Sequence, residues 1–133
     1  MTFAELRVDI VILVCAISAG IHAALAPAHF EEGTAAGVGF VVAAIALGLA
    51  AIALTRNASR YALLATGALL AGLIIVYVPV IATGLPVLHP DQEPVEALAL
   101  CTKAIEAIGL VVAVGCARRP TAQSLARLEG TTT

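Results

Sequence analysis

Four long apolar stretches, separated by short segments rich in polar residues, glycine or proline, dominate the sequence. They cover about residues 5–25, 34–54, 61–82 and 95–117. A helix needs about 20 mostly apolar residues to cross the hydrocarbon core of a bilayer. The stretches are apolar on every side, whereas strands of a transmembrane barrel alternate polar and apolar residues. The pattern therefore predicts an all-α polytopic membrane protein with four transmembrane helices in an antiparallel bundle.

Helix-breaking residues separate the four stretches and place the predicted helix ends. Pro27 and Gly33 follow the first stretch, and Pro120 follows the fourth. We expect Pro27 to end the first helix and to start a short turn, because proline lacks the backbone donor that a continuing helix needs. The chain is thus predicted to form one transmembrane domain, residues 1–119, followed by a short cytoplasmic tail, residues 120–133.

The composition agrees with a bilayer as the main solvent. Hydrophobic residues make up 61% of the chain, charged residues only 12%, and the mean hydropathy is +1.04. A cleaved signal peptide is the competing interpretation of residues 1–28. It is less favoured because Glu5, Arg7 and Asp9 leave the N-terminal segment without the net positive charge that such peptides carry. The first stretch is therefore predicted to be a retained span.

The positions of the basic residues predict an orientation. Arginines lie at position 7, at positions 56 and 60 between the second and third stretches, and at positions 118, 119 and 127 after the fourth. The other two loops contain no lysine or arginine but carry acidic residues. Short loops rich in lysine and arginine stay on the cytoplasmic side. We therefore predict a multi-pass protein of the plasma membrane with both termini in the cytoplasm.

Titratable residues gather on the predicted outer side. The segment AGIHAALAPAHFEEG contains His22, His29 and Glu32, and His89 lies in the other outer loop beside Asp91 and Glu93. Imidazole nitrogens and carboxylate oxygens are ligands for zinc and copper. A zinc or copper site made of His22, His29, Glu32 and His89 is one interpretation. The alternative is that these are solvated residues capping the ends of helices.

Lys103 and Glu106 lie inside the fourth stretch, with Glu106 near the predicted middle of the bilayer. Facing lipid would cost at least about 2.5–3.5 kcal/mol for such a charge, so we expect both side chains to face the bundle. Residues three apart on a helix are neighbours. The two residues are therefore expected to pair with each other or to reach a water cavity. They either form an ion pair that locks the packing or belong to a proton, ion or ligand site.

The sequence favours no enzymatic class. The cysteines at positions 15, 101 and 116 contain no C-x-x-C pair, and the chain has no phosphate loop, nucleophile elbow or H-E-x-x-H motif. It also lacks a basic aromatic surface suited to nucleic acid. We therefore expect a protein without a catalytic site that contacts the lipid bilayer, other membrane subunits or copies of itself.

Several motifs taken together resemble a group of small four-helix actinobacterial membrane proteins without an established activity. The motifs are IHAALAPAHFEE in the first loop, TGLP and EPVE in the third, and a glutamate in the fourth helix. The resemblance implies that the residues of the outer loops and Glu106 belong to one feature. Lys103 departs from that pattern, in which a small or neutral residue stands at this position.

Three functions are consistent with these patterns. The first is a non-catalytic subunit or accessory protein of a larger membrane assembly. The second is a membrane protein that binds or senses a metal ion on its outer side. The third is a small proton-coupled transporter that uses Glu106.

Overall fold

The described part of the chain contains four long helices, as the apolar stretches predict. The computed structural model describes residues 2–83 and 97–118, and the helices are α1 (Phe3–Glu32), α2 (Thr34–Arg56), α3 (Arg60–Thr83) and α4 (Ala97–Ala117). Each helix is long and apolar enough to cross a membrane. Large apolar side chains such as Leu49, Ile75 and Val111 are exposed on the outside of the bundle, where lipid would cover them. The chain is therefore an integral membrane protein of the multi-pass type.

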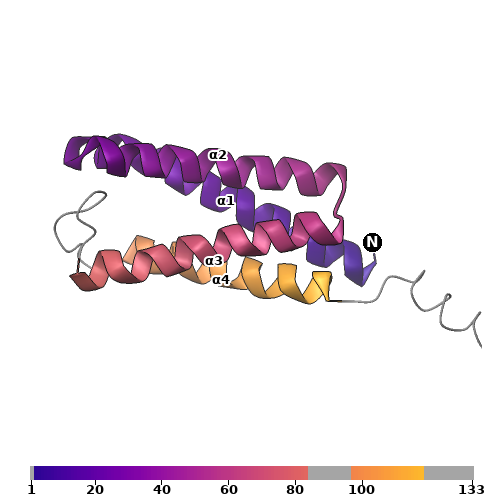
Figure 1. Cartoon of the computed structure of the whole chain (residues 1–133). Coiled ribbons are helices and arrows are strands. Elements are labelled where there is room, and N and C mark those ends of the chain that lie inside the picture. Colours follow the sequence, from indigo (N-terminus) through magenta and orange to yellow (C-terminus); the bar gives the residue numbers. More distant parts are fainter. Residues whose placement is uncertain (1, 84–96, 119–133) are drawn as a thin grey trace, which may run out of the picture.

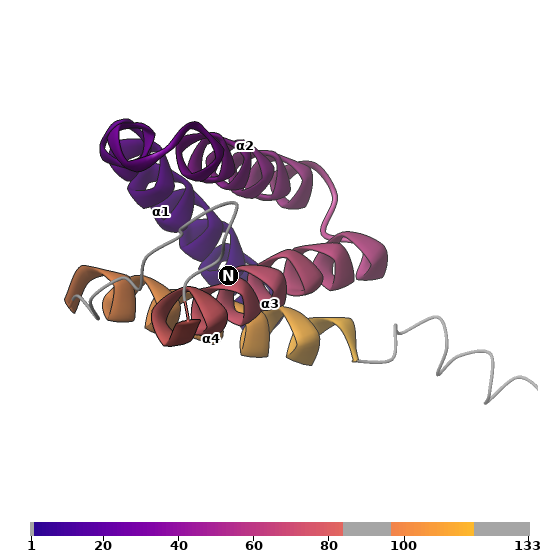
Figure 2. The same ribbon diagram turned by 60° about the vertical axis from the view of Figure 1, so that its left-hand side comes forward.

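The helices form two pairs that meet closely at one end of the molecule. Helix α1 packs mainly against α2, α3 packs against α4, and α1 also contacts α4, whereas the contact between α2 and α3 is the smallest of these four. The N-terminus of α1, the short connection between α2 and α3, and the C-terminal end of α4 lie at the same end (Figure 1). The turned view shows the α1–α2 pair lying over the α3–α4 pair (Figure 2). We call the end that holds the N-terminus of α1 the closed end.

Apolar side chains fill the closed end. The largest buried cluster contains Val11, Val14, Cys15, Leu47, Leu54, Leu63, Leu70, Ala113 and Ala117. Helices α1 and α4 approach so closely at Gly109 that a Cβ atom there would lie 2.5 Å from Cγ1 of Val14. Small residues permit such close backbone approach, which is a main source of helix association in lipid.

The prediction that Pro27 ends the first helix is wrong. Helix α1 continues through Pro27 to Glu32, and the chain turns only at Gly33, whose N–H donates to the carbonyl of His29. Proline removes one hydrogen bond from a helix, but leaving the helix within a bilayer would expose many more unpaired backbone groups. The continued helix keeps His22 and His29 on one rigid element, two turns apart.

The described residues leave some of the sequence-based predictions untested. The cytoplasmic location of both termini remains a prediction. Residues 84–96, which contain His89, Asp91 and Glu93, and the predicted tail from residue 120 lie outside the described part.

Candidate functional site

A polar cluster lies inside the bundle around Glu106, whose side chain is fully buried. One carboxylate oxygen, Oε1, accepts a hydrogen bond from the hydroxyl of Ser18 on α1 at 2.7 Å. The other, Oε2, accepts from the ammonium group of Lys103 on α4 at 2.7 Å. Glu106 thus faces the interior and pairs with Lys103, which is one of the arrangements that the sequence left open. The cluster connects α1 with α4, which belong to different helix pairs.

Helix α1 presents the polar side chains Ser18 and His22 on the face that packs against the bundle. Its buried positions are Val11, Val14, Cys15, Ser18, His22 and Ala26. Apart from the adjacent pair Val14 and Cys15, they follow one another at spacings of three or four residues, which places them on one side of a helix. The face is therefore apolar near the N-terminus of α1 and carries the polar residues Ser18 and His22 further along.

The hydrogen bonds of His22 fix which ring nitrogen carries a proton. Nδ1 lies 2.8 Å from the backbone carbonyl oxygen of Ser18, which can only accept, so Nδ1 must donate. The other nitrogen, Nε2, lies 4.0 Å from Oε1 of Glu106. In the neutral ring Nε2 is an acceptor without a proton, and it faces a carboxylate. A proton on Nε2 would convert this contact into an ion pair.

Lys103 extends from α4 toward α3. Its ammonium group lies 3.4 Å from the backbone carbonyl oxygen of Leu73 and 5.6 Å from the centre of the Tyr77 ring. The hydroxyl oxygen of Tyr77 is buried and has no hydrogen-bond partner within the described part of the chain. An unpaired buried hydroxyl is costly, so its presence points to a missing polar partner.

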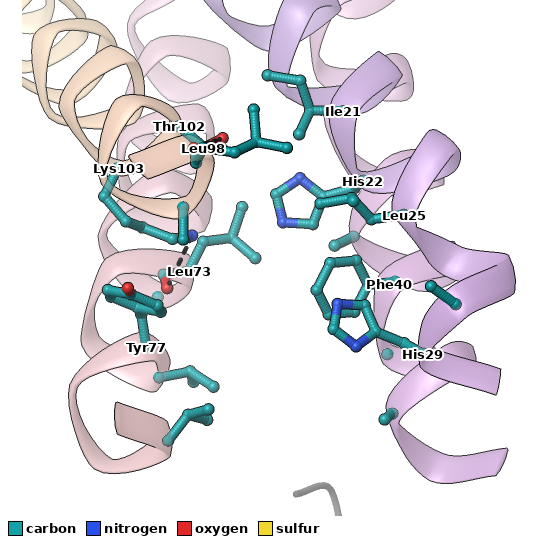
Figure 3. A pocket seen from close by; sticks show the side chains of 18 of the residues that line it. Ile21, His22, Leu25, His29, Phe40, Leu73, Tyr77, Leu98, Thr102 and Lys103 are labelled. Carbon is teal, nitrogen blue, oxygen red and sulfur yellow. Dashed lines mark hydrogen bonds between the residues drawn. The ribbon is translucent and has the colours of Figure 1, made fainter. Parts of the chain in front are cut away.

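A cavity of about 640 Å³ lies between the two helix pairs, on the side away from the closed end. All four helices contribute to its wall, which is mainly apolar, with residues such as Leu25, Phe40 and Leu73. The side chains of His22 and Lys103 extend toward it from opposite sides, and Tyr77 lies beyond Lys103 (Figure 3). Glu106 is behind them and is not part of the wall. This is the size and character of a typical binding site for a small molecule.

A second polar group lies toward the end of α1. Nδ1 of His29 lies 2.7 Å from Oε2 of Glu32, and the His29 ring packs on Phe40 with ring centres 3.7 Å apart. His29, Glu32 and Phe40 all line the cavity. His29 thus has a carboxylate partner that is separate from Glu106.

The residues of the predicted metal site divide between these two groups. His22 faces Glu106, and His29 pairs with Glu32. Within residues 2–83 and 97–118, no three His, Cys, Asp or Glu side chains lie close enough together to hold a metal ion. His89 lies outside the described residues, so the zinc or copper site that includes it remains a prediction.

Sequence reasoning missed two members of the site, Ser18 and Tyr77. A signal for Ser18 was available, because Ser18 and His22 are one turn apart on the same face as Val14 and Cys15. Polar residues on an otherwise apolar inward face indicate partners on a neighbouring helix. Tyr77 resembles an interfacial anchor in sequence, and only its packing beside Lys103 distinguishes it.

Comparison with known protein families, with curated proteins and with solved structures finds no match for this chain. The resemblance to small four-helix actinobacterial membrane proteins therefore stays a prediction, and the geometry of the site alone supports the functional argument.

Proposed function

We propose that this membrane protein is a non-catalytic binding protein that holds a small lipid-soluble molecule in the cavity between its helix pairs. The observation that carries the proposal is the buried Tyr77 hydroxyl, which has no partner in the described part of the chain and belongs to a residue of the cavity wall. Neighbouring atoms cover this oxygen, so a ligand with a polar group beside Tyr77 would supply the missing hydrogen bond once the tyrosine side chain turns its hydroxyl toward the cavity. The apolar wall would hold the remainder of the molecule.

The arrangement of the helices supports access from the bilayer. Helices α2 and α3 make the fewest contacts of any adjacent pair, and both contribute to the cavity wall. Apolar molecules concentrate in the hydrocarbon core, so a cavity between transmembrane helices meets them at high local concentration. The apolar core at the closed end bounds the site on the other side.

The three functions predicted from the sequence relate to this proposal in different ways. A ligand-binding protein can also be an accessory subunit, and a binding cavity is a necessary part of a transporter. Both the accessory role and proton-coupled transport through Glu106 remain predictions. The metal-binding role also remains a prediction, because it needs His89, and it shares His22, His29 and Glu32 with the cavity wall.

Photolabelling can test the proposal with a long-chain alcohol that carries a diazirine in its chain. In protein reconstituted into nanodiscs, we expect saturable labelling of peptides that line the cavity. The variant Gly72→Leu should reduce this labelling several-fold, because Gly72 lines the cavity and faces open space into which the new side chain would extend.

Gly48→Leu is the matched control. Gly48 also has open space beside it but lies outside the cavity wall, so this variant should label like the wild type. Labelling spread evenly over lipid-facing positions such as Ile45 and Val111, and equal in both leucine variants, would refute the proposal.

A further inference from the structure

We propose that the ligand is an amphipathic anion whose charged group binds beside His22 and Lys103, and that its binding is coupled to the uptake of one proton by His22. This inference rests on the proposed function, since it names the charge class of the ligand and the proton that accompanies it. The charges that surround the cavity support this inference.

One ammonium group and one imidazole that can become cationic reach the cavity wall deep in the bundle, whereas the carboxylate that they face does not. His22 and Lys103 line the cavity, whereas Glu106 is fully buried behind them. A ligand in this part of the cavity therefore meets the ammonium group of Lys103 and the imidazole of His22, and not the carboxylate of Glu106. The acidic Glu32 lies near the end of α1, where His29 pairs with it.

The net charge of the deep cluster depends on His22. The ammonium group of Lys103 and the carboxylate of Glu106 are 2.7 Å apart and together are neutral. The groups that face or surround His22 are, by element, Ser18 and His29 on α1, the ring of Phe40 on α2, Tyr77 across the cavity on α3, and Lys103 and Glu106 on α4. With neutral His22 the cluster carries no net charge, and with protonated His22 it carries one positive charge.

The geometry identifies Nε2 as the nitrogen that takes up the proton. Nδ1 already donates to the carbonyl of Ser18, and Nε2 lies 4.0 Å from the Glu106 carboxylate. A proton that arrives from solvent and bonds to Nε2 yields an imidazolium beside that carboxylate. Nothing else in the cluster has to gain or lose a proton.

Low polarity around the cluster couples the proton to an anion. A single net charge in a mainly apolar cavity within the membrane is strongly unfavourable. An anion bound beside neutral His22 would leave one net negative charge, and protonated His22 without an anion would leave one positive charge. The cluster is neutral only when it holds both the anion and the proton or neither of them, so each should raise the affinity for the other, as thermodynamic linkage requires. The apolar wall accommodates the hydrocarbon part of such a ligand.

An alkyl sulfonate with a diazirine in its chain tests this coupling, because a sulfonate keeps its negative charge between pH 5 and 9. The matched probe is the alcohol with the same chain. In nanodiscs, the apparent dissociation constant of the sulfonate should rise with pH once His22 of the unliganded protein has lost its proton. The rise should be about tenfold for each pH unit, as expected for one coupled proton. The dissociation constant of the alcohol should stay constant over the same range.

The variant His22→Gln should remove the pH dependence of sulfonate labelling and weaken binding at pH 6 at least tenfold. His29→Gln is the matched control on the same helix. It should keep the tenfold slope whatever its effect on absolute affinity, since His29 pairs with Glu32 and not with Glu106. If His22→Gln does not fold, the comparison of sulfonate with alcohol in the wild type still decides the question.

The outcomes separate the inference from the proposed function. Sulfonate labelling of the cavity without pH dependence would overturn the coupling to a proton. Saturable labelling by the alcohol but not by the sulfonate would overturn the anionic class while leaving the proposed function intact. Labelling of the cavity by neither probe would overturn both.

Discussion

The two ends of the bundle differ in what lies between the helix pairs. At the closed end, apolar side chains such as Val11, Leu47 and Leu70 fill the space, and Gly109 lets α1 and α4 approach closely. Toward the other end, the pairs enclose the cavity, and the buried contact between α1 and α4 is made by Ser18, Lys103 and Glu106.

The two ends of the bundle contribute differently to the association of the helices in lipid. Apolar packing gives a contact that depends on shape, whereas a buried charge cluster depends on every partner being present. Changes of shape at the closed end are therefore expected to cost less stability than the loss of a single charge from the polar cluster.

The largest effect is expected from breaking the charge cluster. Glu106→Leu removes the acceptor of both Ser18 and Lys103, and it should lower the free energy of unfolding by about 3–5 kcal/mol because it leaves a buried ammonium group unpaired. Unfolding by SDS, followed by circular dichroism, measures this. Glu31→Leu, at an exposed position on α1, should change the value by less than about 0.5 kcal/mol.

A double-mutant cycle measures the interaction energy of the ion pair between Lys103 and Glu106. Combining Lys103→Met with Glu106→Leu replaces the ion pair by apolar groups, and the double variant should be more stable than Glu106→Leu alone. Strict additivity of the two single effects would show that the pair contributes no interaction energy.

A smaller effect is expected at the closed end. Leu47 is fully buried, and Leu47→Ala should cost about 2 kcal/mol, the low end of the usual range, because lipid also solvates the exposed apolar surface. Leu49→Ala on the same helix is the control, since Leu49 is 60% exposed. Equal losses for the two variants would contradict the assignment of the core.

Gly109→Ala probes the close approach of α1 and α4. The new Cβ would lie 2.5 Å from a methyl group of Val14 and 3.1 Å from Cδ1 of Leu70, so the helices must shift. We expect a loss of about 1.5 kcal/mol in thermal or SDS unfolding. Gly115→Ala, which meets open space on the same helix, should be neutral or slightly stabilising.

The smallest expected effect is an increase in the free energy of unfolding. Tyr77→Phe removes a buried hydroxyl without a partner in the described part of the chain, and it should stabilise the unliganded protein by about 1 kcal/mol. The same variant should weaken binding of the diazirine alcohol severalfold. Destabilisation of the unliganded protein would instead indicate that the hydroxyl has a partner within the protein.

The sequence by itself determined that four apolar helices form and where most of them lie. Length and continuous hydrophobicity are local properties, so the spans near residues 34–54, 61–82 and 95–117 follow from them directly. The interior position of Glu106 also followed, because a carboxylate at mid-membrane has no favourable alternative. The end of the first helix did not follow from the sequence. The hydrogen bond that Pro27 removes is opposed by the larger number of backbone groups that a break in the helix would leave unpaired.

Only the tertiary structure decided which polar residues meet. Ser18 and His22 are 88 and 84 positions away from Glu106 in the sequence, and their contact depends on how α1 crosses α4. The separation of His22 from His29 into groups with different carboxylates, and the burial of Tyr77 beside Lys103, have the same origin. Helix crossing is set by the sum of many side-chain contacts, and no local pattern in the sequence records that sum.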